Sequence, residues 1–131
     1  MKKLVTEVSG VVEAPAAQVR AALARALLPG GRDVLGKFTV EDIPGHTSAV
    51  EVTEAVIAFQ GGWWYRGEWS LAPHPAGTLL VHRVYNVARR ARWGVGLANR
   101  FFAGFADDTR RSFTETLTRL GADLGVGTRV T

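Results

Sequence analysis

The last part of the chain carries one long amphipathic helix pattern, and a helix of this length needs a broad apolar surface to pack against. From about Asn99 to Leu124, apolar side chains recur every three to four residues and form one stripe. The stripe consists of Phe102, Phe105, Ala106, Thr109, Phe113, Thr116, Leu117, Leu120 and Leu124. Asp107 and Arg111 lie on the opposite side of the helix, and we expect their side chains to face water. The remaining residues must therefore supply the apolar partner surface.

The segments before this helix follow the two-residue period of β-strands. The predicted strands cover residues 4–13, 34–43, 48–59, 63–72 and 78–88. Short connections such as the Pro-His-Pro-Ala-Gly stretch at 73–77 favour hairpins, so we expect antiparallel strands. A shorter amphipathic helix is predicted over residues 16–28, because Pro15 suits a first helical turn and Pro29-Gly30-Gly31 ends the pattern.

This order of elements indicates an α+β fold in which one antiparallel sheet curves to cover the long C-terminal helix. The chain has 131 residues, so we expect a single domain over residues 1–131. It contains no cysteine, which excludes disulfides and thiol chemistry, and a chain of this length buries enough surface to fold without them.

Composition and charge limit the classes of partner that this chain is expected to bind. Hydrophobic residues make up 47% and charged residues 21%, as in ordinary globular proteins. No apolar stretch approaches the ~20 residues that cross a bilayer, so no stable membrane insertion is expected. Glu7 interrupts the segment where a signal peptide needs an apolar run, which favours a cytoplasmic location. Residues 89–92 form the one dense basic cluster, which we interpret as a solvated loop rather than a nucleic-acid surface.

Signatures of cofactor and metal chemistry are absent from the sequence. The stretch at 94–99 lacks the third glycine of a dinucleotide-binding motif and has no parallel βαβ unit around it. His46, His74 and His82 show no ligand spacing with one another. We therefore expect no cofactor and no metal.

Three stretches, in this order, resemble the START-like (SRPBCC) helix-grip superfamily, which includes bacterial polyketide cyclase/dehydrase-like proteins. Residues 11–19 are similar to the family's first strand, which runs through Ala-Pro into a helix. Residues 71–81 are similar to its strand, turn and Gly-Thr strand start, and residues 113–124 to its terminal helix. Together with the order of elements, the resemblance spans nearly the whole chain.

The resemblance implies a curved antiparallel sheet wrapped around the C-terminal helix, with an apolar cavity between them. Members of the superfamily bind sterols, lipids, polyketides or plant hormones there, and some catalyse cyclisation or dehydration. It therefore implies that this chain binds a small hydrophobic or aromatic ligand, either lipid-like or polyketide-like. The superfamily has no universal catalytic residue, so the fold alone assigns no reaction.

The candidate ligand-binding residues come from two predicted strands and the long helix. They are Trp63, Tyr65, Trp69, Arg83, Tyr85, Phe105, Thr109 and Phe113. Arg83 shares a strand face with apolar neighbours, and an inward arginine needs an ion-pair partner or an anionic ligand. The opposite strand parity would instead turn His82 and Asn86 inward, with His82 as a candidate acid or base.

Two other functions remain open at this stage. A polyketide cyclase or aromatase-like enzyme would use Arg83, Tyr85 or His82 to polarise carbonyls and move protons. A protein-interaction module would have a cavity filled by its own bulky side chains. An outward Trp64 beside charged residues would suit a self-association surface, which makes a homodimer possible.

Overall fold

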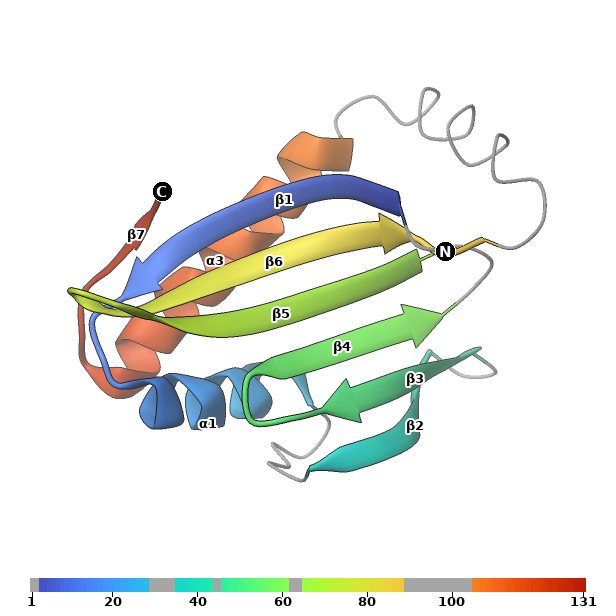
Figure 1. Ribbon diagram of the computed structural model, residues 1–131, viewed down its shortest axis with the longest axis horizontal. Helices are drawn as coiled ribbons and strands as arrows, with labels where there is room; N and C mark the ends of the chain where they lie inside the picture. Colours follow the sequence, from blue (N-terminus) through green and yellow to red (C-terminus); the bar gives the residue numbers. More distant parts are fainter. Residues whose placement is uncertain (1–2, 29–34, 44–45, 62–64, 89–104) are drawn as a thin grey trace.

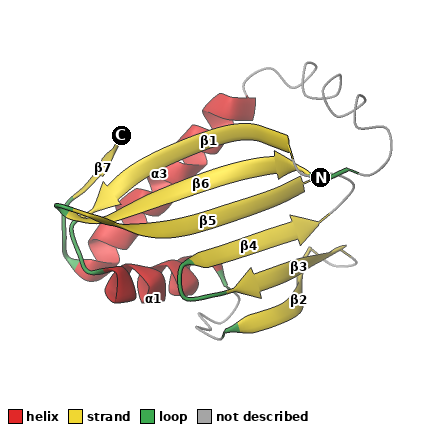
Figure 2. Cartoon of the chain, in the orientation of Figure 1, coloured by secondary structure: helices red, strands yellow, loops and turns green. Residues whose placement is uncertain are grey.

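The computed structural model describes residues 3–28, 35–43, 46–61, 65–88 and 105–131. These residues form a seven-stranded antiparallel sheet with two helices on one of its faces (Figures 1 and 2). The elements are β1 (Lys3–Val12), α1 (Ala16–Leu27), β2 (Gly36–Ile43), β3 (His46–Val52), β4 (Val56–Gly61), β5 (Tyr65–His74), β6 (Gly77–Asn86), α3 (Phe105–Leu124) and β7 (Thr128–Val130). The predicted α+β class and antiparallel pairing are confirmed.

The strand order across the sheet is β2-β3-β4-β5-β6-β1-β7. Strands β2 to β6 form a meander because each connection is short enough for a hairpin. The predicted turn between β5 and β6 is confirmed, and His74 Nδ1 accepts a hydrogen bond from the Ala76 N–H at 3.0 Å. The first strand, β1, extends the meander by pairing with the free side of β6.

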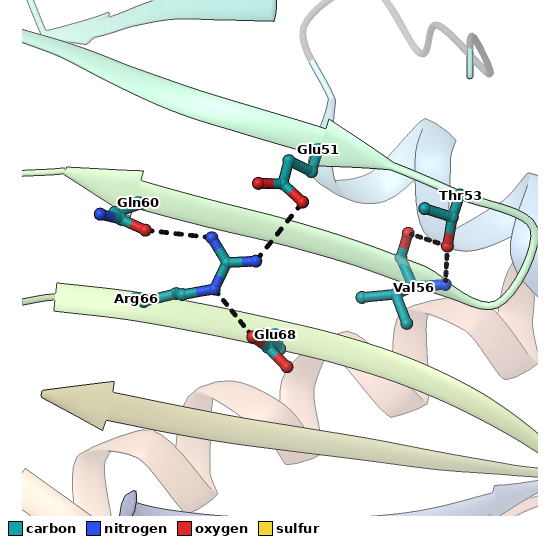
Figure 3. Close-up of polar contacts among 6 residues, drawn as sticks. All are labelled: Glu51, Thr53, Val56, Gln60, Arg66 and Glu68. Carbon is teal, nitrogen blue, oxygen red and sulfur yellow. Dashed lines mark hydrogen bonds and ion pairs between the residues drawn. The ribbon is translucent and has the colours of Figure 1, made fainter. Parts of the chain in front are cut away.

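The prediction of one strand over residues 48–59 is wrong, because a tight turn divides it into β3 and β4. The Thr53 N–H donates to the Val56 carbonyl at 2.8 Å, and the Thr53 hydroxyl accepts from the Val56 N–H at 3.0 Å (Figure 3). Glu54 and Ala55 at the tip are not typical turn residues, and β-branched residues continue on both sides. The sequence pattern therefore conceals this turn.

The chain beyond α3 adds a short strand that the sequence analysis did not predict. Gly125 adopts a positive φ of 67° and ends the helix, as glycine commonly does at this position. The three residues of β7 then pair with the end of β1. A strand of three residues is too short to show a period. The predicted helix start at residues 99–104 lies outside the described residues.

The close packing of α3 on the sheet depends on Gly10 in β1. A Cβ atom at this position would lie 2.6 Å from Leu117 Cδ2 and 2.9 Å from the Arg129 carbonyl oxygen. Phe113 and Leu120 of α3 are fully buried. The prediction that the apolar stripe of the terminal helix faces the sheet is confirmed for Phe113, Leu117 and Leu120, whereas Ala106 of the same stripe is exposed. Neither helix in the described part combines the length and apolar character that a membrane crossing requires.

The other face of the sheet carries charged side chains. Arg66 Nε donates to Glu68 Oε2 at 2.8 Å, Nη1 donates to Gln60 Oε1 at 3.0 Å, and Nη2 lies 3.6 Å from Glu51 Oε2 (Figure 3). Arg66 and Glu68 therefore lie on the face away from the helices. The two faces of the sheet therefore differ sharply in polarity.

Replacing Phe113 by alanine should lower the free energy of unfolding by about 3–5 kcal/mol, because its ring is fully buried against Trp69. Urea denaturation followed by circular dichroism measures this loss. The exposed neighbour Thr114→Ala serves as the control and should change the free energy by less than about 0.5 kcal/mol. A loss below about 2 kcal/mol for Phe113→Ala would mean that its ring borders an empty space.

Candidate functional site

A pocket of about 230 Å³ lies between β5 and β6 on one side and the first turns of α3 on the other. The sheet and the helix each contribute three of its lining residues. They are Tyr65, His82 and Val84 from the strands, and Asp108, Thr109 and Ser112 from α3. The pocket is open to solvent at one side, since Asp108 and Ser112 are exposed. It is therefore a cleft with a polar rim and a ring-lined inner wall.

His82 belongs to a stack of three rings that extends from the pocket into the core. The His82 ring stacks on Trp69 with a centroid distance of 4.1 Å, and Trp69 stacks on Phe113 at 5.7 Å. Trp69 is only 7% exposed and Phe113 is fully buried. These two candidate ligand-binding residues consequently belong to the core, and His82 is the member of the stack that reaches the pocket.

Burial makes His82 an uncharged imidazole at neutral pH. Desolvation lowers its pKa from 6.5 to about 4, although a hydrogen bond to the Glu68 carbonyl works weakly in the other direction. Nδ1 lies 3.3 Å from that carbonyl oxygen, so Nδ1 carries the proton and donates. This tautomer leaves Nε2 as a hydrogen-bond acceptor.

The Tyr65 ring is placed in the pocket wall by a glycine two residues along the same strand. A Cβ atom at Gly67 would lie 2.5 Å from the Tyr65 hydroxyl oxygen and 3.0 Å from Cζ. The ring therefore lies over Gly67, in the space that the side chain of any other residue at position 67 would occupy. Burial raises the pKa of the Tyr65 phenol, so it also stays uncharged near neutral pH.

The helix side of the pocket comes from positions i, i+1 and i+4, which share one side of α3. Asp108 Oδ1 accepts from Arg111 Nη1 at 3.1 Å, and each of these side chains is 70% exposed. Arg111 therefore pairs with Asp108, three residues earlier on the helix. Asp108 and Ser112 are absent from the list of candidate ligand-binding residues. The shared spacing of Asp108, Thr109 and Ser112 is the signal that could have found this rim.

The prediction that Arg83 faces the helix is wrong. Its Nε donates to Glu7 Oε2 at 2.5 Å, and Nη1 lies 3.5 Å from Ser70 Oγ, all on the face away from α1 and α3. Alternation along β6 places Tyr85 on the same outer face. His82 and Asn86 are buried on the helix face, which confirms the alternative strand parity.

The physical reason for this error is that β6 carries apolar residues at both parities. Leu79, Val81 and Val87 alternate with Leu80 and Val84, so the two-residue period does not identify the inner face. Of the other candidates, Tyr65 and Thr109 line the pocket. Trp63 lies outside the described residues. Phe105 is the first residue of α3, and its side chain is not among the described parts of the structure.

A second hollow of about 470 Å³ lies beside the start of α1. Its lining is Ala16, Ala17, Arg20, Leu35 and Glu54. Leu35 is 56% exposed, and of the five only Arg20 is partly buried. The lining of this hollow is therefore mostly exposed, whereas the smaller pocket contains the buried His82, which makes the pocket at His82 the better candidate site.

Among the described residues, no group of three histidine, aspartate or glutamate side chains lies close enough to hold a metal ion. No protein-family model matches the chain, and neither the curated proteins nor the solved structures searched contain a significant match.

The low pKa of His82 predicts a loss of stability in acid. The unfolded state binds a proton near pH 6.5 and the folded state only near pH 4, so stability is fully present above 6.5 and is lost as pH falls toward 4. Between about pH 7 and about pH 4.5 the loss from this group is roughly 2 kcal/mol. Urea denaturation at both pH values measures it.

His82→Gln should remove this part of the pH dependence, whereas His74→Gln at the β5–β6 turn should keep it. Carboxyl groups also titrate in this range, so the difference between each variant and the wild type is the readout. Equal pH dependence in the wild type and His82→Gln would show that His82 is not buried in its neutral form.

Proposed function

We propose that the chain binds a small hydrophobic or aromatic ligand in the pocket between β5, β6 and α3, and that it has the helix-grip architecture of the START-like superfamily. One observation carries the proposal. Two uncharged rings, the half-buried Tyr65 and the buried His82, face the hydroxyl-bearing residues Thr109 and Ser112 across a space of about 230 Å³. The position between sheet and terminal helix is where the resemblance places a ligand.

The volume limits the size of the ligand. A cavity of about 150 Å³ holds benzene, and pockets for drug-sized molecules span roughly 300–1,000 Å³. A pocket of about 230 Å³ therefore takes one substituted ring or a short acyl segment. A larger lipid or polyketide would insert one ring or chain end, and the rest would lie outside the described pocket.

The lining also sets the polarity of the ligand. Val84 and the two rings favour an apolar or planar body, because they offer carbon-rich surface. The threonine and serine hydroxyls, together with His82, offer hydrogen bonds to a hydroxyl or carbonyl group on that body. A ring with one such substituent satisfies both sides of the pocket.

An enzyme of the polyketide cyclase or dehydrase type is the second candidate. Arg83 and Tyr85 face the opposite side of the sheet, so catalysis in this pocket falls to His82. Its unprotonated imidazole can accept a proton from a bound substrate at neutral pH. The remaining alternative, a protein-interaction module with a filled cavity, is supported by the packed rings of Trp69 and Phe113, which occupy the core beside the pocket.

Filling the pocket tests the binding proposal. 1-Naphthol, a planar ring system with one hydroxyl, should bind the wild type in a calorimetric titration. Ser112→Phe places a ring in the pocket from an exposed helix position and should weaken binding at least about tenfold, which corresponds to ~1.4 kcal/mol. The melting temperature should stay near that of the wild type.

Thr118→Phe is the matched control, because Thr118 is also exposed on α3 but does not line the pocket. This variant should bind 1-naphthol like the wild type. Binding that Ser112→Phe leaves intact, or that both variants weaken equally, would place the ligand elsewhere. If the chain is an enzyme, His82→Gln should abolish turnover and retain part of the affinity.

A further inference from the structure

Strand β2 lies at the edge of the sheet, and among the described residues no other strand pairs with its outer side. An edge strand presents a row of unpaired backbone N–H and C=O groups that can accept another strand. The regular part of β2 runs from Lys37 to Glu41, between Gly36, which has a φ of 128°, and a register shift after Glu41. This part contains no proline, so every residue keeps its backbone N–H.

The two faces of β2 differ in the same way as the two faces of the whole sheet. Lys37, Thr39 and Glu41 are exposed. Phe38 and Val40 are half-buried and pack against the core on the helix face. Their apolar rows end at this edge, since Phe38 pairs with the buried Val50 of β3 and has no described neighbour beyond it.

We propose that a second copy of this chain pairs with β2 in antiparallel fashion, centred on Thr39, so that two sheets join edge to edge in a two-fold symmetric dimer. A two-fold axis at Thr39 places this residue opposite its counterpart in the second copy. Lys37 then lies opposite Glu41 of the second copy, and Phe38 lies opposite Val40. Each of these pairs occurs twice because of the symmetry.

The residue types select this register over its neighbours. If the two-fold axis passed through Phe38, Lys37 would lie opposite Thr39 of the second copy. If it passed through Val40, Glu41 would lie opposite Thr39, so in neither case would the two charges meet. A shift of the pairing by one residue would place the apolar face of one copy on the same side of the joined sheet as the polar face of the other. The Thr39 register joins opposite charges on one face and apolar residues on the other.

The charged face of the sheet continues into this pairing. Lys37 lies opposite Glu51 in the β2–β3 ladder, and Glu51 contacts Arg66, which bonds to Glu68 (Figure 3). Glu41 of the second copy would extend this alternation of charge by one more residue. A lysine on an edge strand generally discourages pairing with unrelated strands. A second copy of this chain instead places a glutamate opposite the lysine, and opposite charges on paired strands attract. The dimer should therefore be reversible and weaken as salt concentration rises.

Charge exchange tests the pairing. Sedimentation velocity over a range of protein and salt concentrations should show a dimer for the wild type. Lys37→Glu places glutamate opposite glutamate, and Glu41→Lys places lysine opposite lysine, so each variant alone should be monomeric. An equimolar mixture of the two should form a heterodimer, and the double variant should dimerise again. Both residues are exposed, so the fold should tolerate each change.

A single cysteine tests the register directly, because the chain has none of its own. Residues opposite each other in antiparallel strands have Cα atoms about 4.5–5.5 Å apart, within the range of a disulfide. Thr39→Cys should therefore give a covalent dimer under mild oxidation. Ala49→Cys, exposed on the next strand and roughly 14 Å from its counterpart, should not.

Two results would overturn the proposal. One is a wild type that stays monomeric at every concentration, with no cross-linking of Thr39→Cys. The other is a dimer that persists in both single charge variants or that cross-links equally well through Ala49→Cys. The second result would place the interface on another surface.

Discussion

The contact between Phe113 of α3 and Trp69 of β5 is the interaction on which the rest of the structure depends. It fixes the helix over the centre of the sheet, and Gly10 lets the helix approach closely because any side chain there would collide with Leu117. The same stack holds His82 against Trp69 in a buried position. The low pKa of this histidine, and with it the uncharged inner wall of the pocket, therefore follows from the packing of the helix.

Covering only one face of the sheet with helices gives the two faces different chemistry. The helix face is apolar and contains the pocket, while the outer face balances charges across neighbouring strands, as Arg66 does with Glu51 and Glu68. The Arg66 and Glu68 side chains are only 17% and 16% exposed, whereas Glu51 is 40% exposed. In the proposed dimer, this alternating order of charge would favour a second copy of the chain over an unrelated strand at the β2 edge.

The candidate site was only partly predictable because its lining comes from elements far apart in the sequence. Tyr65 and Thr109 were selected as members of apolar faces, and both line the pocket. Asp108 and Ser112 were not selected, because a polar residue at a pocket rim looks like any solvated helix position. Trp69 and Phe113 were selected for their size, but large rings are equally suited to fill a core, and the structure uses them in this way.

The sequence by itself determined the α+β class, both helical segments and most strand positions, because local periodicity and turn residues act over a few neighbours. It did not determine which face of β6 is inner, since apolar residues stand at both parities, and it concealed the Thr53–Val56 turn. Only the tertiary structure decided these points. A strand face becomes the inner one when a helix packs on it, and that contact joins residues as distant as Gly10 and Leu117.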